Sequence, residues 1–505
     1  MVDMALRWDD FSGGDYGSVD SPKAEPNQYR ATNMVVYDSG LIGPRAGLKA
    51  LVLGGTPPTH TTAPGPQGFG VFGGNLLLVQ DRIHQIPITA PTAVAQAVYP
   101  ASATTPVRFA QANNVLYSLK SGVVYKHVGT GTTAATMPTG ITFSQLVQWD
   151  QWLIGVDVAT PYRIWFTFLD SGGPNFDSWP NTNYLYVGGN DTITALLPIF
   201  NTLYVGKASG WWAVSGVLGI QASSRAVALG NGPKDYRLAA ATTDNRIAYW
   251  PGEDSPAVFN GESVRVLIEH DLRQTQTVPT SDGVIVTPTG QKIIMAGDAT
   301  AATGGTHLYV YERGKWAYHT VPFAIGGMTP QDVRYGYAMP SGVIFVVNNP
   351  ATIGTAVTIA SWAHQTMRPA HLTDTWAAPI DTTATDLVSG SLELRSWYDG
   401  QGRQVRVRSV IVQFRKWASG VANSLNRINM NVTVHGQYEA GSTTGDVLQW
   451  YEPSERASAT GVDDSWRANV GEQGYGNGFT ITFPKIQGIA IREVIALVDI
   501  RTTKT

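Results

Sequence analysis

The amino-acid sequence predicts an all-β protein, a β-propeller of six or seven blades with a C-terminal β-sandwich and a short N-terminal segment. Three observations indicate this fold class: a hairpin phrase that recurs through the middle of the chain, turns rich in Gly, Asn and Asp, and longer alternating strands toward the end. We expect residues 1–68 to form the N-terminal segment and linker, residues 69–376 the propeller and residues 377–505 the sandwich.

The recurring phrase is clearest in two stretches. They read LVQWDQWLIGVDVATPYRIWFTFLDSGG from residue 146 and LLPIFNTLYVGKASGWWAVSG from residue 196. Each stretch starts with apolar residues, crosses a short turn centred on Asp150 or Asn201, and returns as a strand, predicted at residues 152–156 and 203–205. Short strands separated by Asn, Asp and Gly are typical of antiparallel hairpins and not of βαβ units.

Similar phrases begin at residues 72, 109, 146, 196, 239, 284 and 337. Their mean spacing of about 44 residues lies within the range of one four-stranded propeller blade. Because a single blade cannot bury both of its faces, neighbouring blades must stack around a ring. A pair of β-sandwiches with similarly spaced hairpins is the alternative, since no phrase carries a WD or kelch signature.

Composition narrows the possible functions. Charged residues make up only 14% of the 505 residues, and a charge-poor surface is often covered by other copies or other subunits; an exposed surface rich in Gly and Thr is the other explanation. The formal net charge of −3 argues against a general nucleic-acid coat. The absence of cysteine excludes disulfides and thiolate metal sites. The start of the chain lacks the pattern of a signal peptide, and no apolar run of about 18 residues predicts a membrane-spanning segment.

One candidate contact surface is the segment of residues 170–190, DSGGPNFDSWPNTNYLYVGGN, which shows no clear strand before residue 184. Long loops in propellers project from a rim and commonly make contacts. We therefore expect Phe176, Asp177 and Trp179 to be rim-loop contact residues.

A second candidate surface is basic. Arg406 and Arg408 lie two residues apart, so on a strand they share one face, and Arg415 and Lys416 follow on the same stretch. Such a face fits DNA phosphates or an acidic neighbouring subunit. A solvated strand face is the alternative interpretation.

We find no catalytic constellation in the sequence. None of the nine histidines forms HExxH or another close metal pair, and GxSxG, Walker and GxGxxG motifs are absent. The nearest approach to a sialidase Asp box is TTDNRIAYW, in which Thr242 and Asp244 fit but Arg246 replaces the glycine. We therefore expect no enzymatic activity, no cofactor and no metal site.

The order of the parts points to a known family. The phrase GLIGPRAGL comes first, then YRIWFTFLDSGGPNFDSWPNTNYLYVGGNDTITALLPIFNTLYVGKASGWWAVSG, and a terminal GFTITFPKIQGIAIREVIALVDI. In this order, and in residues 40–47, 165–168 and 211–212, the chain resembles the tail hub or nozzle proteins of short-tailed bacteriophages. The resemblance spans nearly the whole chain in architecture.

The resemblance implies a structural role in the virion tail, after assembly in the host cytoplasm. Six copies would form a ring below the portal and the adaptor, extend the DNA channel, and retain the genome until ejection. The ring would also present surfaces to tail fibre, tailspike or needle proteins. Because a basic channel lining would retain DNA phosphates, we expect the face with Arg406 and Arg408 to lie between subunits.

Three other functions stay open from the sequence. One is a distal tail protein of a long-tailed phage. Another is a receptor-binding propeller in which tryptophans such as Trp179 or Trp211 stack on glycans, although tryptophans within strand phrases usually pack in a core. The third is a propeller glycosidase, whose two carboxylates would come from distant strands.

Overall fold

The structure of the protein is a computed structural model. It describes residues 2–11, 29–36, 41–44, 48–51, 68–79, 82–87, 96–100, 107–128, 131–170, 173–241, 246–251, 257–266, 284–286, 292–297, 307–312, 315–320, 332–339, 342–348, 358–363, 390–398, 405–416, 429–437, 443–451, 462–469, 473–474, 476–483 and 489–500. In these ranges the regular elements are strands, with one short 3₁₀ helix, η1 (Tyr236–Leu238).

Seven four-stranded antiparallel sheets make up the propeller, and we number them as blades one to seven along the chain. From the innermost strand outward, the first three blades are β6 (Gly68–Phe72), β7 (Asn75–Val79), β8 (Arg82–Pro87) and β9 (Gln96–Pro100); then β10 (Val107–Ala112), β11 (Val115–Lys120), β12 (Val123–Val128) and β13 (Gly131–Ala134); then β14 (Phe143–Trp149), β15 (Trp152–Asp157), β16 (Arg163–Phe166) and β19 (Tyr184–Tyr186). The fourth and fifth blades are β20 (Ile193–Ile199), β21 (Thr202–Lys207), β22 (Gly210–Ser215) and β23 (Ser223–Leu229); then β24 (Ala239–Ala241), β25 (Ile247–Tyr249), β26 (Ala257–Phe259) and β27 (Val264–Val266). The sixth and seventh blades are β28 (Val284–Val286), β29 (Lys292–Gly297), β30 (His307–Glu312) and β31 (Lys315–Thr320); then β32 (Asp332–Met339), β33 (Gly342–Asn348), β34 (Thr358–Ala363) and β5 (Leu48–Leu51).

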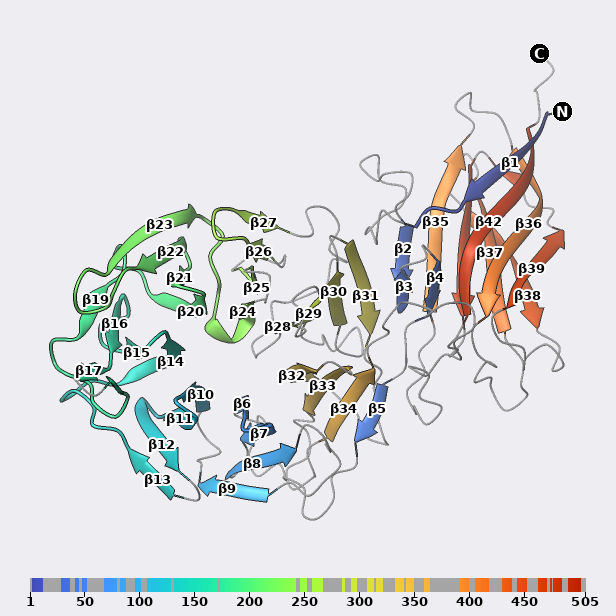
Figure 1. The fold of residues 1–505 in the computed structure, drawn as a ribbon. Coiled ribbons are helices and arrows are strands. Elements are labelled where there is room, and N and C mark those ends of the chain that lie inside the picture. The colour runs from blue at the N-terminus through green and yellow to red at the C-terminus, as the bar shows by residue number, and fades with distance from the viewer. Residues whose placement is uncertain are drawn as a thin grey trace. The chain divides into compact units, whose positions relative to one another are not determined.

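The innermost strands close into a ring. Each of β6, β10, β14, β20, β24 and β28 contacts the innermost strand of the next blade, and β32 contacts β6 again. Blades two to four can be followed around this ring in Figure 1. The predicted β-propeller is confirmed, with seven blades, and the alternative of two sandwiches for this part of the chain is wrong.

Apolar side chains fill the space between neighbouring blades, which is why the strand phrases are apolar on both faces. The two adjacent tryptophans of β22 illustrate this. Trp212 packs with Trp152 and Phe166 of the third blade, whereas Trp211 packs with Tyr249 and Phe259 of the fifth. Successive side chains of a strand point to opposite faces, so the pair Trp211–Trp212 joins the fourth blade to both of its neighbours.

The N-terminal residues supply strands to both parts of the fold. β5 is the outermost strand of the seventh blade. This blade therefore combines one strand that precedes the first blade in the sequence with three strands that follow the sixth. β1 (Val2–Trp8) and β4 (Ile42–Pro44) pair with β42 (Ile489–Ile500), and β2 (Tyr29–Thr32) pairs with β35 (Gly390–Tyr398). The described strands within residues 1–68 are therefore distributed differently from the separate N-terminal segment expected from the sequence.

Two sheets form the β-sandwich. One has the order β3 (Met34–Val36), β4, β42, β36 (Val405–Lys416), β39 (Val462–Asn469), with β1 also on β42 and β40 (Gln473–Gly474) on β36. The other has the order β2, β35, β41 (Gly476–Phe483), β37 (Asn429–Gln437), β38 (Thr443–Tyr451). Buried side chains of both sheets share one core, including Leu6, Leu392, Val412, Phe479 and Val494.

By compactness the chain divides into two units. One comprises residues 1–49, 307–326 and 362–505, and the other comprises residues 50–306 and 327–361. The ring of innermost strands lies within the second unit.

Candidate functional site

The insertion in the third blade folds onto the propeller. β17 (Phe168–Asp170) pairs with β18 (Gly173–Asn175), and the chain then returns to form β19. Phe176 and Trp179, expected as rim contacts, are only 6% and 3% exposed and belong to the core shared by the second and third blades. The Trp179 ring lies 4.7 Å from that of Phe143. These two side chains anchor the insertion, and their burial differs from the exposed position expected from the sequence.

Asp177 is the partly exposed member of the three expected rim residues, but it also binds within the chain. Its carboxylate accepts hydrogen bonds from Tyr117 Oη at 3.0 Å and from Lys126 Nζ at 2.6 Å. Burial, followed by the charge and the hydrogen bond of Asp177, raises the pKa of Tyr117. Asp177 therefore ties the insertion to the second blade.

The basic strand of the sandwich carries an ion pair at Arg408. Arg406 and Arg408 are exposed on either side of buried Val407 in β36. Arg408 Nη1 lies 3.4 Å from Oδ1 of Asp499, a side chain that is itself almost fully buried. The side chains of Arg415 and Lys416 lie outside the described part of the structure. The charge of Arg408 is therefore compensated within the chain.

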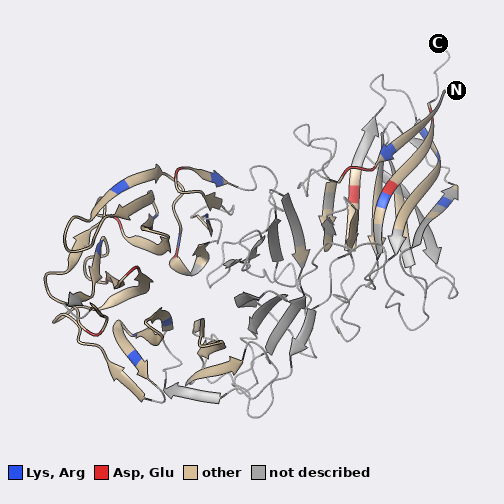
Figure 2. Ribbon diagram, in the orientation of Figure 1, with Lys and Arg blue, Asp and Glu red and all other residues tan. Residues whose placement is uncertain are grey.

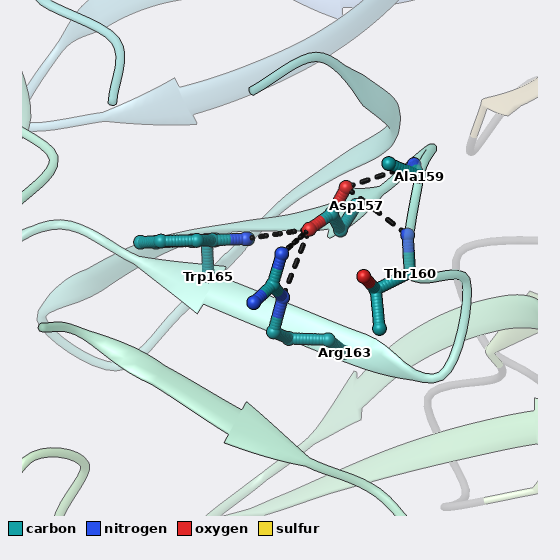
Figure 3. Close-up of polar contacts among 5 residues, drawn as sticks. All are labelled: Asp157, Ala159, Thr160, Arg163 and Trp165. Carbon is teal, nitrogen blue, oxygen red and sulfur yellow. Dashed lines mark hydrogen bonds and ion pairs between the residues drawn. The ribbon is translucent and has the colours of Figure 1, made fainter. Parts of the chain in front are cut away.

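A buried carboxylate organises one end of the third blade (Figure 3). Asp157 ends β15 and its side chain is 0% exposed. Oδ2 accepts hydrogen bonds from Nε of Arg163 at 2.9 Å and Nε1 of Trp165 at 3.1 Å, and Arg163 Nη2 also binds it. Oδ1 accepts from the backbone N–H groups of Ala159 at 2.9 Å and Thr160 at 3.3 Å. One side chain thereby holds the β15–β16 turn and the start of β16.

These bonds also set the ionisation of Asp157. Burial alone would raise the pKa of this carboxyl, but the hydrogen bonds from Arg163, Trp165 and the two backbone N–H groups outweigh burial and hold the pKa below its ordinary value. The group is thus a carboxylate at neutral pH, and its charge is compensated by the Arg163 guanidinium.

One tryptophan and two tyrosines surround this arginine. The guanidinium carbon of Arg163 lies 4.9 Å from the ring centroid of Trp165, 5.4 Å from that of Tyr184 and 5.9 Å from that of Tyr186. The rings of Tyr184 and Tyr186 are 5.5 Å apart, and Tyr162 lies 5.8 Å from Tyr186. Tyr184 and Tyr186 are 40% and 49% exposed. We call Tyr162, Tyr184 and Tyr186 the tyrosine cluster.

The fourth blade holds a buried charge at the matching position. Phe143 pairs with Asp157 as Ile193 pairs with Lys207, so the two charges end the second strand of their blades. Lys207 Nζ donates to Gly189 O at 2.8 Å and to Asp191 Oδ1 at 3.1 Å, and lies 5.0 Å from the Trp212 ring centroid. In both blades a buried charge beside a tryptophan fixes local turn structure.

A serine–histidine pair lies in the second blade. Ser118 Oγ is 2.7 Å from Nε2 of His127, and Nδ1 of His127 is 3.0 Å from Thr132 Oγ1. The serine and the histidine are each buried, so a substrate cannot reach the hydroxyl. Burial lowers the pKa of His127 to about 4. The three side chains join β11, β12 and β13, which is a structural role.

Substituting His127 with glutamine should flatten the pH dependence of stability. Between pH 6.5 and about 4 the unfolded chain binds a proton at His127 that the folded chain does not, so stability falls as the pH falls through this window. The full difference corresponds to about 3 kcal/mol. Urea denaturation of wild type and His127→Gln at several pH values measures it. An unchanged pH slope in His127→Gln would contradict the prediction.

In the described residues no group of three or more His, Asp or Glu side chains is arranged to hold a metal ion. Thr242 and Asp244 of the partial Asp box lie outside those residues. Lys, Arg, Asp and Glu residues occupy few positions along the described strands (Figure 2). Of the helices in the described chain, none is long and apolar enough to cross a membrane.

No protein-family model matches the chain, and no curated protein matches it. Among solved structures it is similar to U3-55K, with 10% identity over 64% of this chain and 100% of that one and a TM-score of 0.42. It is similar to BBS1N in its complex with ARL6, at 11% identity, 64% and 98% coverage and a TM-score of 0.40. BamB from Moraxella catarrhalis gives 11% identity, 71% and 100% coverage and a TM-score of 0.37.

The sequence did not single out Asp157 or the tyrosine cluster. The alternation in YLY is visible in the sequence and places both tyrosines on one face of a short strand. Which face is exposed depends on the neighbouring blade, so the sequence alone carries no signal for it.

Proposed function

We propose that this chain is a structural protein of the tail of a short-tailed bacteriophage, a nozzle or hub. Six copies form a ring that extends the DNA channel below portal and adaptor, retains the genome and guides its ejection. The observation that carries the proposal is an aromatic side chain, Phe200, held exposed in an unfavourable backbone conformation. It supports assembly with other protein subunits.

Phe200 occupies the tip of the hairpin between β20 and β21. It is 78% exposed and has a φ of 49°. The corresponding tips of the first three blades carry residues that tolerate this left-handed conformation, namely Gly73 and Gly74, Asn113 and Asn114, and Asp150. A phenylalanine there costs on the order of 1 kcal/mol relative to those residues.

The carbonyl oxygen of Phe200 accepts a hydrogen bond from Trp149 Nε1 at 3.3 Å, but its ring lies mostly in solvent. Val217 and Ile220 lie in the β22–β23 turn, at the same end of the fourth blade as Phe200, and are also exposed, Ile220 by 79%. A bulky apolar group kept at a strained and exposed position is best explained by contact with a partner molecule. We call Phe200, Val217 and Ile220 the apolar rim.

The remaining support is consistent with this assignment. A charge content of 14% suits a chain whose surface is largely covered in an assembly. The parts of the chain follow one another in an order that resembles tail hub and nozzle proteins, and this resemblance is the reason for proposing a phage tail as the assembly. Its neighbours would be the adaptor on one side and a fibre, tailspike or needle protein on the other.

Substituting Phe200 with asparagine should separate assembly from folding. We expect wild type, alone or mixed with adaptor–portal complexes, to form rings of about six subunits with an open centre. Phe200→Asn should fold with equal or greater stability, since asparagine tolerates the positive φ, but should assemble more weakly. Sedimentation velocity and negative-stain imaging measure both properties.

Val128→Thr, at an exposed position on the second blade, is the matched control and should assemble like wild type. A wild-type monomer that also fails to join adaptor–portal complexes would overturn the proposed function. Rings that form equally well from Phe200→Asn would remove the apolar rim from the interface.

A further inference from the structure

The tyrosine cluster exposes aromatic rings that the propeller core does not need. Tyr184 and Tyr186 alternate with the less exposed Leu185 on β19, the outermost strand of the third blade. The outermost strands of the second, fourth and fifth blades read GTTA, SSRAVAL and VRV and carry no aromatic residue, whereas those of the first and sixth blades, QAVYP and KWAYHT, do. The two exposed tyrosines of β19 therefore distinguish the third blade from the second, fourth and fifth.

The insertion in the third blade leads directly into β19, the strand that carries Tyr184 and Tyr186. After β16 the chain makes the β17–β18 hairpin and the anchored turn with Phe176 and Trp179, and only then enters β19. In the second, fifth and sixth blades the fourth strand follows the third after a short connection, as β13 follows β12. An insertion fixed by two buried aromatic residues thus delivers two exposed ones, as expected for a binding loop on a rigid scaffold.

Contacts with Arg163 and Trp165 hold the rings of Tyr184 and Tyr186 in place. Arg163 lies within cation–π distance of Tyr184 and Tyr186, and Asp157 fixes its guanidinium by two hydrogen bonds. The Tyr184 ring also packs against Trp165 at 5.3 Å. Rings held in place before binding lose little conformational entropy when a ligand stacks on them.

The charges beside the cluster indicate which class of ligand it binds. The Asp157 carboxylate compensates the Arg163 guanidinium, which is itself mostly buried. The Arg163–Asp157 pair therefore presents no net charge to attract phosphate or carboxylate groups. Tyrosine offers an apolar ring face and a hydroxyl that donates and accepts hydrogen bonds. Asn181 and Thr182, close by in the sequence, add an exposed amide and an exposed hydroxyl.

We propose that the tyrosine cluster, Tyr162, Tyr184 and Tyr186, is a carbohydrate-binding surface for uncharged polysaccharide. A pyranose presents C–H groups on its ring face and hydroxyls along its edge, which matches aromatic rings bordered by amide and hydroxyl groups. Trp179 and Trp211, the tryptophans considered for glycan stacking from the sequence, are buried and do not form this surface. The inference does not rest on the proposed function.

The test uses the full-length protein on an array of uncharged gluco-, galacto- and manno-oligosaccharides, with heparin oligosaccharides as the charged comparison. We expect binding to at least one uncharged series and none to heparin. For the best ligand, Tyr184→Ala and Tyr186→Ala should each raise the Kd about tenfold or more. Tyr184→Phe keeps the ring and should lose much less affinity for this ligand. Phe200→Asn, which removes an exposed aromatic ring elsewhere, should bind like wild type.

Circular dichroism and thermal denaturation establish that each variant is folded before its binding is compared. Lack of binding to every uncharged series would overturn the proposal, as would a preference for heparin or a Kd unchanged in both alanine variants. Tyr184→Ala and Tyr186→Ala could instead bind sugar like wild type but fail to form rings. That outcome would assign the cluster to a protein partner. Assembly defects confined to Phe200→Asn concern the proposed function alone.

Discussion

Substituting Asp157 with alanine is expected to lower the free energy of unfolding by about 3–5 kcal/mol. The side chain is fully buried and accepts hydrogen bonds from Arg163, Trp165 and two backbone N–H groups. Without it, the mostly buried guanidinium of Arg163 loses its counter-charge and the indole N–H of Trp165 loses its acceptor. The indole N–H is then a buried donor without a partner, and the guanidinium is a mostly buried charge without its carboxylate.

Urea denaturation followed by circular dichroism measures this change. Asp150→Asn, in the exposed turn of the same blade, is the matched control and should change stability by no more than about 0.5 kcal/mol. A double-mutant cycle with Arg163→Met should show strong coupling between the two charged groups. Equal stability of Asp157→Ala and Asp150→Asn would mean that the buried pair does not hold the blade.

The same substitution should alter the response to acid. Because the pKa of Asp157 is depressed in the folded chain, its contribution is complete above the unfolded-state pKa and is lost as the pH falls through the folded pKa. Asp157→Ala should therefore be destabilised most at neutral pH, and its difference from wild type should shrink in acid.

Substituting Trp211 with alanine is expected to cost about 3–5 kcal/mol of stability. Its side chain is 0% exposed, stacks on Phe259 at 5.1 Å between ring centroids, and meets Tyr249 edge-on at 5.2 Å. The alanine variant leaves a cavity between the fourth and fifth blades, where the apolar faces of both depend on each other.

Trp211→Phe keeps an aromatic ring and should lose clearly less stability. Phe200→Asn, which removes an exposed aromatic residue, is the control. The midpoint of thermal denaturation gives the order of the three variants. If Trp211→Ala lost binding to a sugar while keeping wild-type stability, the core position assigned to this tryptophan would be contradicted.

The repeat pattern was readable from the sequence because hairpin chemistry is local. Each of the seven phrase starts, from residue 72 to residue 337, falls within the innermost strand of a blade. The turn at Asp150 and the strand after it are found where the sequence places them. Alternation of side chains and turn-forming residues act over a few positions, so a single sequence displays them.

Contacts between residues far apart in the sequence were decided only by the tertiary structure. β5 completes the seventh blade and β1 to β4 join the sandwich, although no pattern in these short segments names a partner. Phe176 and Trp179 are buried while Tyr184 and Tyr186, a few residues later, are exposed. The sequence thus determined the fold class and the order of the repeats, whereas the structure decided between six and seven blades. Burial and strand pairing depend on which surface lies opposite, and that surface comes from another blade or from the other end of the chain.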